Sequence, residues 1–201
     1  MAIPIASNIP TYCNDTQTLE ESRVELGKGD GPLLAYFGFI NPPKGFELVL
    51  EVTKLIGARL IVIGQLDEND QYHKRIIGLI ERLGLTDSVI VLGFQKPQDV
   101  AKYLRVADAC VFPFVDGVSP KNGSFLAAVA QGTFTVTTSK ERRGYDPREN
   151  VCYVAPGDVN GMVACLKSHC GHHVEPNPKT WPSWGEVAAR HQDLYRQLRG
   201  E

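Results

Sequence analysis

The chain has 201 residues, of which 43% are hydrophobic, and its formal net charge is −2 at pH 7. This length suits one large α/β domain, and this charge argues against nucleic acid or a basic membrane surface as a partner. The sequence has no signal peptide and no apolar run long enough to span a bilayer. Two of the five cysteines, Cys110 and Cys152, lie in apolar runs typical of strands. We therefore expect buried thiols and a cytoplasmic protein.

The first residues differ from the rest of the chain. Residues 1–14 begin apolar and then become rich in Pro, Asn and Asp. They predict a linker that enters a single domain over residues 15–201. Thr18 and Glu21 have the spacing of a capping box, for a helix that ends near Gly27.

From Leu33 onward, short apolar runs alternate with segments of helical spacing. Strands are expected at 33–37, 59–63, 88–92, 109–112, 135–138 and 151–154. Helices are expected at 46–56, 72–83, 97–107, 124–131 and 158–170. Unbroken apolar strands that alternate with amphipathic helices predict an α/β fold with a doubly wound, mostly parallel sheet covered by helices on both faces.

A last helix follows, and Ser183 with Glu186 predicts a capping box at its start. Its apolar positions fall on one stripe, which we interpret as a face that packs into the core. The stripe consists of Trp184, Val187, Ala188, His191, Tyr195 and Leu198.

Three of the predicted strands end in glycine, at Gly38, Gly64 and Gly93. The carboxyl ends of parallel strands lie on one edge of the sheet, where ligands bind. Glycine removes side chains from the approach to that edge. The three glycines together therefore favour a ligand crevice there.

The stretch from Phe112 to Gly132 carries the strongest signal for a ligand. A polar loop with Lys121 and Gly123 leads into a short helix of small residues, which Ser124 or Asn122 could cap. A helix start attracts phosphate, and Lys44 lies in another loop expected at the same edge. This arrangement suits a diphosphate, although an ordinary capped connection with two solvated lysines remains the alternative.

Several other chemistries are disfavoured. The chain has no Gly-x-Gly-x-x-Gly after its first strand, no Walker loop and no Gly-x-Ser-x-Gly elbow. Arg142, Arg143 and Asp146 fall near the ligand edge and could touch a ligand or be solvated. One cluster of possible metal ligands lacks a four-ligand pattern, so we expect no metal and no cofactor. It consists of Cys165, His169, Cys170, His172 and His173.

Three segments resemble one known family. GFINPPKG at 38–45, VIVLGFQKPQDVAKYLRVADACVFPF at 89–114 and PSWGEVAARHQDLY at 182–195 are similar to the donor-binding, C-terminal domain of family-four-type glycosyltransferases of the GT-B fold. The resemblance covers about residues 4–198 and implies a Rossmann-like half of that fold. Residues 4–9 resemble the linker from a first, acceptor-binding domain, which would be missing.

The resemblance also implies roles for single residues. Lys44 matches the family's phosphate-binding lysine, whereas the partner arginine would fall at Phe39. The family's Glu-x7-Glu acids fall on Ser119 and Ala127, and residues 117–124 resemble the Gly-x-Ser-x-x-x-Gly-Ser loop of a divergent branch. Ser119 would touch the sugar as the catalytic-position residue. The implied substrate-binding residues are Gly38, Lys44, Gly64, Gly93, Phe94, Lys121, Gly123, Ser124 and Phe125.

We therefore expect the nucleotide-sugar-binding domain of a glycosyltransferase, whose donor is a nucleotide-diphosphate sugar. Alone, without an acceptor domain, it would transfer nothing. The absence of both acids leaves a second interpretation open, a non-catalytic sugar-nucleotide-binding or interaction module. A third and weaker one is half of a sugar-nucleotide epimerase.

Overall fold

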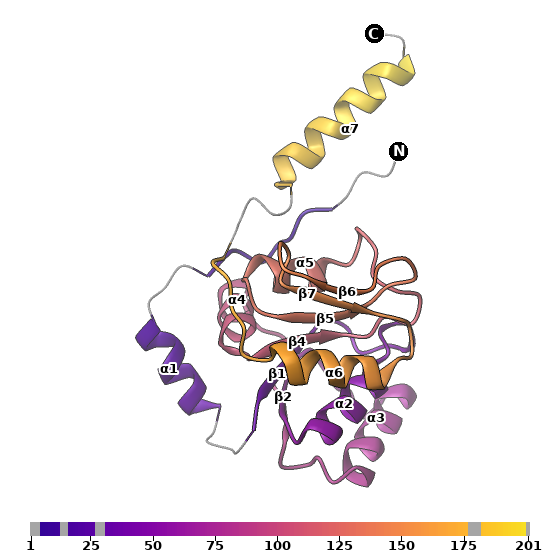
Figure 1. Cartoon of the computed structure of the whole chain (residues 1–201). Coiled ribbons are helices and arrows are strands. Elements are labelled where there is room, and N and C mark those ends of the chain that lie inside the picture. The colour runs from indigo at the N-terminus through magenta and orange to yellow at the C-terminus, as the bar shows by residue number, and fades with distance from the viewer. Residues whose placement is uncertain (1–4, 13–15, 27–30, 177–181, 200–201) are drawn as a thin grey trace.

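The computed structural model describes residues 5–12, 16–26, 31–176 and 182–199 (Figure 1). Its centre is a seven-stranded sheet in the order β3-β2-β1-β4-β5-β7-β6. The strands are β1 (Leu33–Phe37), β2 (Arg59–Ile63), β3 (Val89–Val91), β4 (Ala109–Phe112), β5 (Thr135–Thr138), β6 (Gly144–Asp146) and β7 (Val151–Val154). All neighbouring pairs are parallel except β6 with β7.

The expected doubly wound sheet is confirmed. Five strands match their predicted bounds and are buried along almost their whole length, as parallel strands covered on both faces must be. The edge strand β6 was not predicted, because its three residues form no apolar run and remain partly exposed.

Helices cover both faces of the sheet (Figure 1). The described helices are α1 (Thr16–Glu25), α2 (Phe46–Ile56), α3 (Gln71–Arg82), α4 (Pro97–Val106), α5 (Gly123–Ala130), α6 (Val159–His169) and α7 (Trp184–Arg199), of which α7 lies away from the sheet; a 3-10 turn η1 (Pro42–Lys44) follows β1. The helices α2, α3 and α6 pack together on one face, and α4 packs with α5 on the other. None of them, within the described ranges, is long and apolar enough to cross a bilayer.

Two helix starts differ from the sequence prediction. The helix α1 begins at Thr16, so Thr18 lies inside it and the capping box proposed for Thr18 and Glu21 is wrong. The helix α3 begins one residue early because Asp70 caps it: the carboxylate accepts from the N–H groups of Tyr72 at 2.8 Å and His73 at 2.9 Å.

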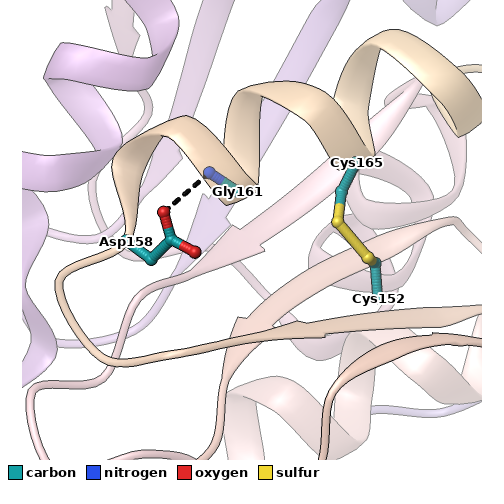
Figure 2. Close-up of a disulfide and its surroundings, with 4 residues drawn as sticks. All are labelled: Cys152, Asp158, Gly161 and Cys165. Carbon is teal, nitrogen blue, oxygen red and sulfur yellow. Dashed lines mark hydrogen bonds between the residues drawn. A yellow bond between two sulfur atoms is a disulfide. The ribbon is translucent and has the colours of Figure 1, made fainter.

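The cysteine prediction is half correct. Cys110 is a free thiol that is fully buried in β4, as expected. Cys152 is not a thiol: it forms a disulfide with Cys165 and joins β7 to α6 (Figure 2). The two cysteines are separated by 13 positions, and the chain between them includes the turn that brings α6 back over the sheet, so only the fold places them together. Asp158 starts that helix by accepting from the N–H of Gly161 at 2.8 Å.

The last helix, α7, keeps its predicted cap but not its predicted packing. Ser183 and Glu186 form the reciprocal bonds of a capping box. Of the apolar stripe, Val187 alone is buried, whereas Leu198 is 75% exposed. The stripe is therefore not part of the core, and α7 extends away from the sheet (Figure 1). The ring of His191 bonds within the same helix, to the carbonyl oxygen of Val187 at 2.8 Å.

Residues 5–12 have no helix or strand, yet they pack against the end of α5. The N–H of Tyr12 donates to Gln131 Oε1 at 2.7 Å, and Gln131 Nε2 donates to the carbonyl oxygen of Pro10 at 2.9 Å. Asn8 Oδ1 accepts from the indole of Trp184 at 2.6 Å. Gln131 is wholly buried, so this segment is fastened to the sheet domain at its α5 side.

Candidate functional site

The ends of β1 and β2 lie beside the start of α5. Gly38 has φ of 132°, a value that favours glycine, and a methyl group there would lie 3.5 Å from Ser124 Cβ. A methyl group at Gly64 would lie only 2.4 Å from the carbonyl oxygen of Gly38. The structure therefore brings three of the predicted residues together and explains why two of them are glycines.

Lys44 enters from the loop that follows β1. A methyl group at Gly45 would lie 2.3 Å from the carbonyl oxygen of Pro113, and Val115 N–H donates to the carbonyl oxygen of Pro43 at 3.1 Å. These contacts hold the loops after β1 and β4 against each other. They place Lys44 Nζ 4.9 Å from the centre of the Phe114 ring.

The environment of Lys44 is unusual for a lysine. The side chain is partly buried, and this burial lowers the pKa of its ammonium group. No carboxylate pairs with it among the residues that the structure describes. A half-buried cation without a counterion favours binding of an anion.

The start of α5 is not capped as the sequence predicted. Asn122 occupies the capping position, but its Oδ1 accepts from the N–H and the hydroxyl of Ser119, at 2.6 and 2.9 Å. Neither Asn122 nor Ser124 caps the helix with its side chain. Within the described part of the chain the N–H of Ser124 therefore has no acceptor. A free N–H at a helix start suits a phosphate oxygen.

Several predicted residues lie apart from this cluster. Gly93 and Phe94 follow the edge strand β3, two strands from β1. Phe94 is 74% exposed, and a methyl group at Gly93 would touch nothing within 4 Å. Lys121 is exposed in the loop before α5. The ring of Phe125 packs edge-on to Phe112 in the core, which leaves only its backbone to face the site.

The two positions of the acidic pair differ in surroundings. Ser119 is exposed in the loop before α5, and its backbone N–H and hydroxyl both bond to Asn122. Ala127 is wholly buried on α5. No carboxylate therefore stands at either position, and Ala127 has no contact with solvent.

Sequence reasoning missed Phe114, whose ring lies below the ammonium group of Lys44. An apolar residue after a buried strand gives no sign that a cation will lie on it. The signal lies instead in Pro43 and Gly45, which bend the loop after β1 onto the loop after β4.

Residues 31–170 match the family described as glycosyl transferases group 1. A D-inositol 3-phosphate glycosyltransferase from Segniliparus rotundus is 32% identical over 98 residues, which are 46% of this chain and 22% of that protein. A sucrose-phosphate synthase from Thermosynechococcus elongatus superposes on 96% of this chain and 52% of its own, with a TM-score of 0.72 and 24% identity. HepE from Anabaena, solved with UDP and glucose, superposes on 96% of this chain and 56% of its own, with a TM-score of 0.74 and 16% identity.

The mostly parallel sheet with helices on both faces defines a Rossmann-like domain of the GT-B type. The chain belongs to the glycosyl transferases group 1 family, and it is a divergent C-terminal domain of that fold. It spans about half the length of these two solved neighbours.

Proposed function

We propose that this chain is the donor-binding domain of a glycosyltransferase that takes its sugar from a nucleotide diphosphate. The diphosphate lies between the ammonium group of Lys44 and the N–H of Ser124 at the start of α5, where Gly38 and Gly64 leave room. Ser119 contacts the sugar from the loop before α5. Lys121 adds charge from the same loop, and Gly93 and Phe94 border the base at the outer edge of the sheet.

One observation carries this proposal: Lys44 is partly buried and unpaired at the same sheet edge as an uncapped helix start. A partly buried ammonium group loses hydration, and a bound anion restores its stabilisation most fully. The leaving diphosphate of a glycosyl transfer is such an anion, and basic groups with a helix dipole stabilise it without a metal.

We further propose that a second domain supplies the acceptor. The exposed stripe of α7 gives that domain an apolar surface, because Trp184, Tyr195 and Leu198 are 49%, 61% and 75% exposed. Without that domain the donor site stays open to water, so this chain alone binds weakly and transfers no sugar. Its setting in the cell is, on this proposal, the cytoplasm.

A non-catalytic sugar-nucleotide-binding module is the second candidate. The observation that favours it is the missing acidic pair, with a buried alanine at 127 and an exposed serine at 119. Sugar transfer by the two-domain protein would exclude this candidate.

Titration calorimetry with UDP, GDP and ADP tests the phosphate site. Replacing Lys44 by Ala should weaken binding of the preferred nucleotide by about 10-fold or more, the usual value of a hydrogen bond to a charged group. Lys54→Ala is the matched control, because Lys54 is exposed in the last turn of α2. Its affinity should stay within about twofold of the native chain.

Two results would contradict the proposal. One is no binding of any nucleotide at millimolar concentration, and the other is equal affinity for the Lys44 and Lys54 variants. Sugar transfer by the 201 residues alone would contradict the claim that the acceptor side lies in another domain.

A further inference from the structure

A second group of basic residues lies at the edge of the sheet, where the loop after β5 and the edge strand β6 adjoin β7. A cavity of about 380 Å³ opens there, and Arg142, Arg143 and Arg148 line it together with Asp146 and Tyr153. It is separate from the cluster of Lys44 and Ser124, which lies at the ends of β1 and β2.

Two of the three arginines are neutralised by carboxylates. Arg142 pairs with Asp146 and with Glu149, each at 2.9 Å, and its guanidinium lies 3.8 Å from the centre of the Tyr153 ring. Arg148 pairs with Asp146 at 2.9 Å. This network holds one wall of the cavity in place. Its two arginines and two carboxylates together carry no net charge.

Arg143 is different because no carboxylate of the described chain pairs with it. Its Nη1 donates to two carbonyl oxygens, those of Ser139 at 2.5 Å and Arg142 at 2.7 Å. These bonds hold the guanidinium in place without neutralising it. Its Nε and Nη2 donors have no partner in the described residues, so one edge of the planar group is free for a bidentate acceptor.

The loop that carries Arg143 is also held in place at its beginning. Ser139 Oγ accepts from the N–H groups of Glu141 at 3.2 Å and Arg142 at 3.0 Å. A preorganised guanidinium loses less side-chain entropy when it binds an anion. The cavity therefore has a positioned cation, free donors and room for a small group.

This site adjoins the loop before α5. Val118 N–H donates to the carbonyl oxygen of Thr138 at 2.7 Å, and a methyl group at Gly117 would lie 3.2 Å from Ser139 Cα. Residue 117 is two positions before Ser119, and the carbonyl of Ser139 holds Arg143. The arginine cavity thus flanks the loop that we assign to the sugar.

We propose that this cavity binds a phosphate or carboxylate group through Arg143. The group belongs to a substrate of the transfer reaction, as a charged substituent distinct from the donor diphosphate; this second statement rests on the proposed function. The positively charged Arg143 gives the site its preference for an anion, and the bidentate edge gives its preference for a phosphate monoester or a carboxylate.

The test is an NMR titration of the chain with inorganic phosphate and, separately, with acetate. We expect phosphate or acetate to shift the signals of Arg143 and Tyr145, with a dissociation constant on the order of 10 mM or below. Arg143→Gln should weaken this binding at least tenfold. Lys140 lies in the same loop but is paired with Asp116, so Lys140→Gln should leave the dissociation constant within twofold of the native value.

Each outcome decides the proposal. Shifts with phosphate alone indicate a phosphorylated substrate, and shifts with acetate as well indicate a carboxylate-bearing one; both uphold the site. No shift at the cavity, or equal binding by Arg143→Gln and the native chain, overturns it. Failure of nucleotide binding at Lys44 would remove the proposed function and leave the cavity's own anion binding standing, so the two failures are distinguishable.

Discussion

The helices α5 and α7 show opposite relations between sequence and packing. The sequence of α5 has almost no polar face, and six of its eight residues are buried under the sheet and α4. The sequence of α7 has a clear apolar stripe, yet Val187 is the one buried residue among its sixteen. An apolar stripe in the sequence indicates a helix face that suits packing, whereas the structure decides whether that face is buried.

The two helices therefore differ in how firmly they are joined to the sheet: α5 is packed into the core, and α7 lies outside it. The start of α5 lies at the sheet edge that we propose binds the ligand, and its end holds residues 5–12 in place through Gln131. The described contacts of α7 with the rest are few, and one of them is the bond from Trp184 to Asn8. Stability should therefore depend strongly on α5 and weakly on α7.

The largest expected effect compares one leucine on each helix. Leu126 on α5 is 1% exposed, and Leu198 on α7 is 75% exposed. Leu126→Ala should lower the free energy of unfolding by about 2–4 kcal/mol, because it leaves a cavity in the core. Leu198→Ala should change it by less than about 0.5 kcal/mol. Urea unfolding followed by circular dichroism measures both, and equal losses would show that α7 packs as tightly as α5.

A smaller effect on stability is expected when a glutamine at the end of α5 is compared with a glutamine on α7. Gln131→Ala removes the partners of Tyr12 N–H and of the Pro10 carbonyl, and should cost about 1–3 kcal/mol. Gln192→Ala, on the exposed surface of α7, should cost almost nothing. Limited proteolysis should cut residues 5–12 faster in the first variant alone. Similar unfolding and similar cleavage of both variants would contradict the fastening role of Gln131.

The segment between α5 and α7 should respond to acid. Burial, and then the charge of Arg105, lower the pKa of His173 from 6.5 to about 4, against the opposing charge of Asp108. The folded chain thus holds His173 neutral where the unfolded chain protonates it. Its contribution to stability is complete above pH 6.5 and is lost as the pH falls toward 4.

The loss is on the order of 2 kcal/mol, after allowance for partial exposure of the ring. The bridge of His173 to Thr133 lies next to the end of α5, so acid should loosen the connection toward α7. His173→Asn should flatten the pH dependence of unfolding between pH 6.5 and 4, whereas His191→Asn should not. Identical pH profiles for the native chain and His173→Asn would contradict this assignment.

The fold could be predicted from the sequence because its signals are local and repeated. Apolar runs of four or five residues, each followed by helical spacing, determine a parallel sheet without knowledge of any contact. The strand β6 was not predicted because its three residues are at least partly exposed and do not form an apolar run. The cap at Asp70 was missed although aspartate is a common capping residue, because the apolar pattern of α3 starts at Tyr72.

The site could be predicted only in part, for a physical reason. Glycines at strand ends and Lys44 indicated the edge, since topology alone brings strand ends together. Asn122 was assigned to the helix, but its side chain bonds backward to Ser119, a choice that depends on the loop conformation. The disulfide of Cys152 likewise depends on how α6 returns over β7.

The crystal structure of the chain with its preferred nucleoside diphosphate tests the central claim most directly. We predict phosphate oxygens within about 3 Å of both Lys44 Nζ and the N–H of Ser124. Gly38 and Gly64 should border the diphosphate, and Lys44 should keep its place over the ring of Phe114. A nucleotide whose phosphates bind elsewhere, for example at Arg143, with Lys44 free of any phosphate, would contradict the account.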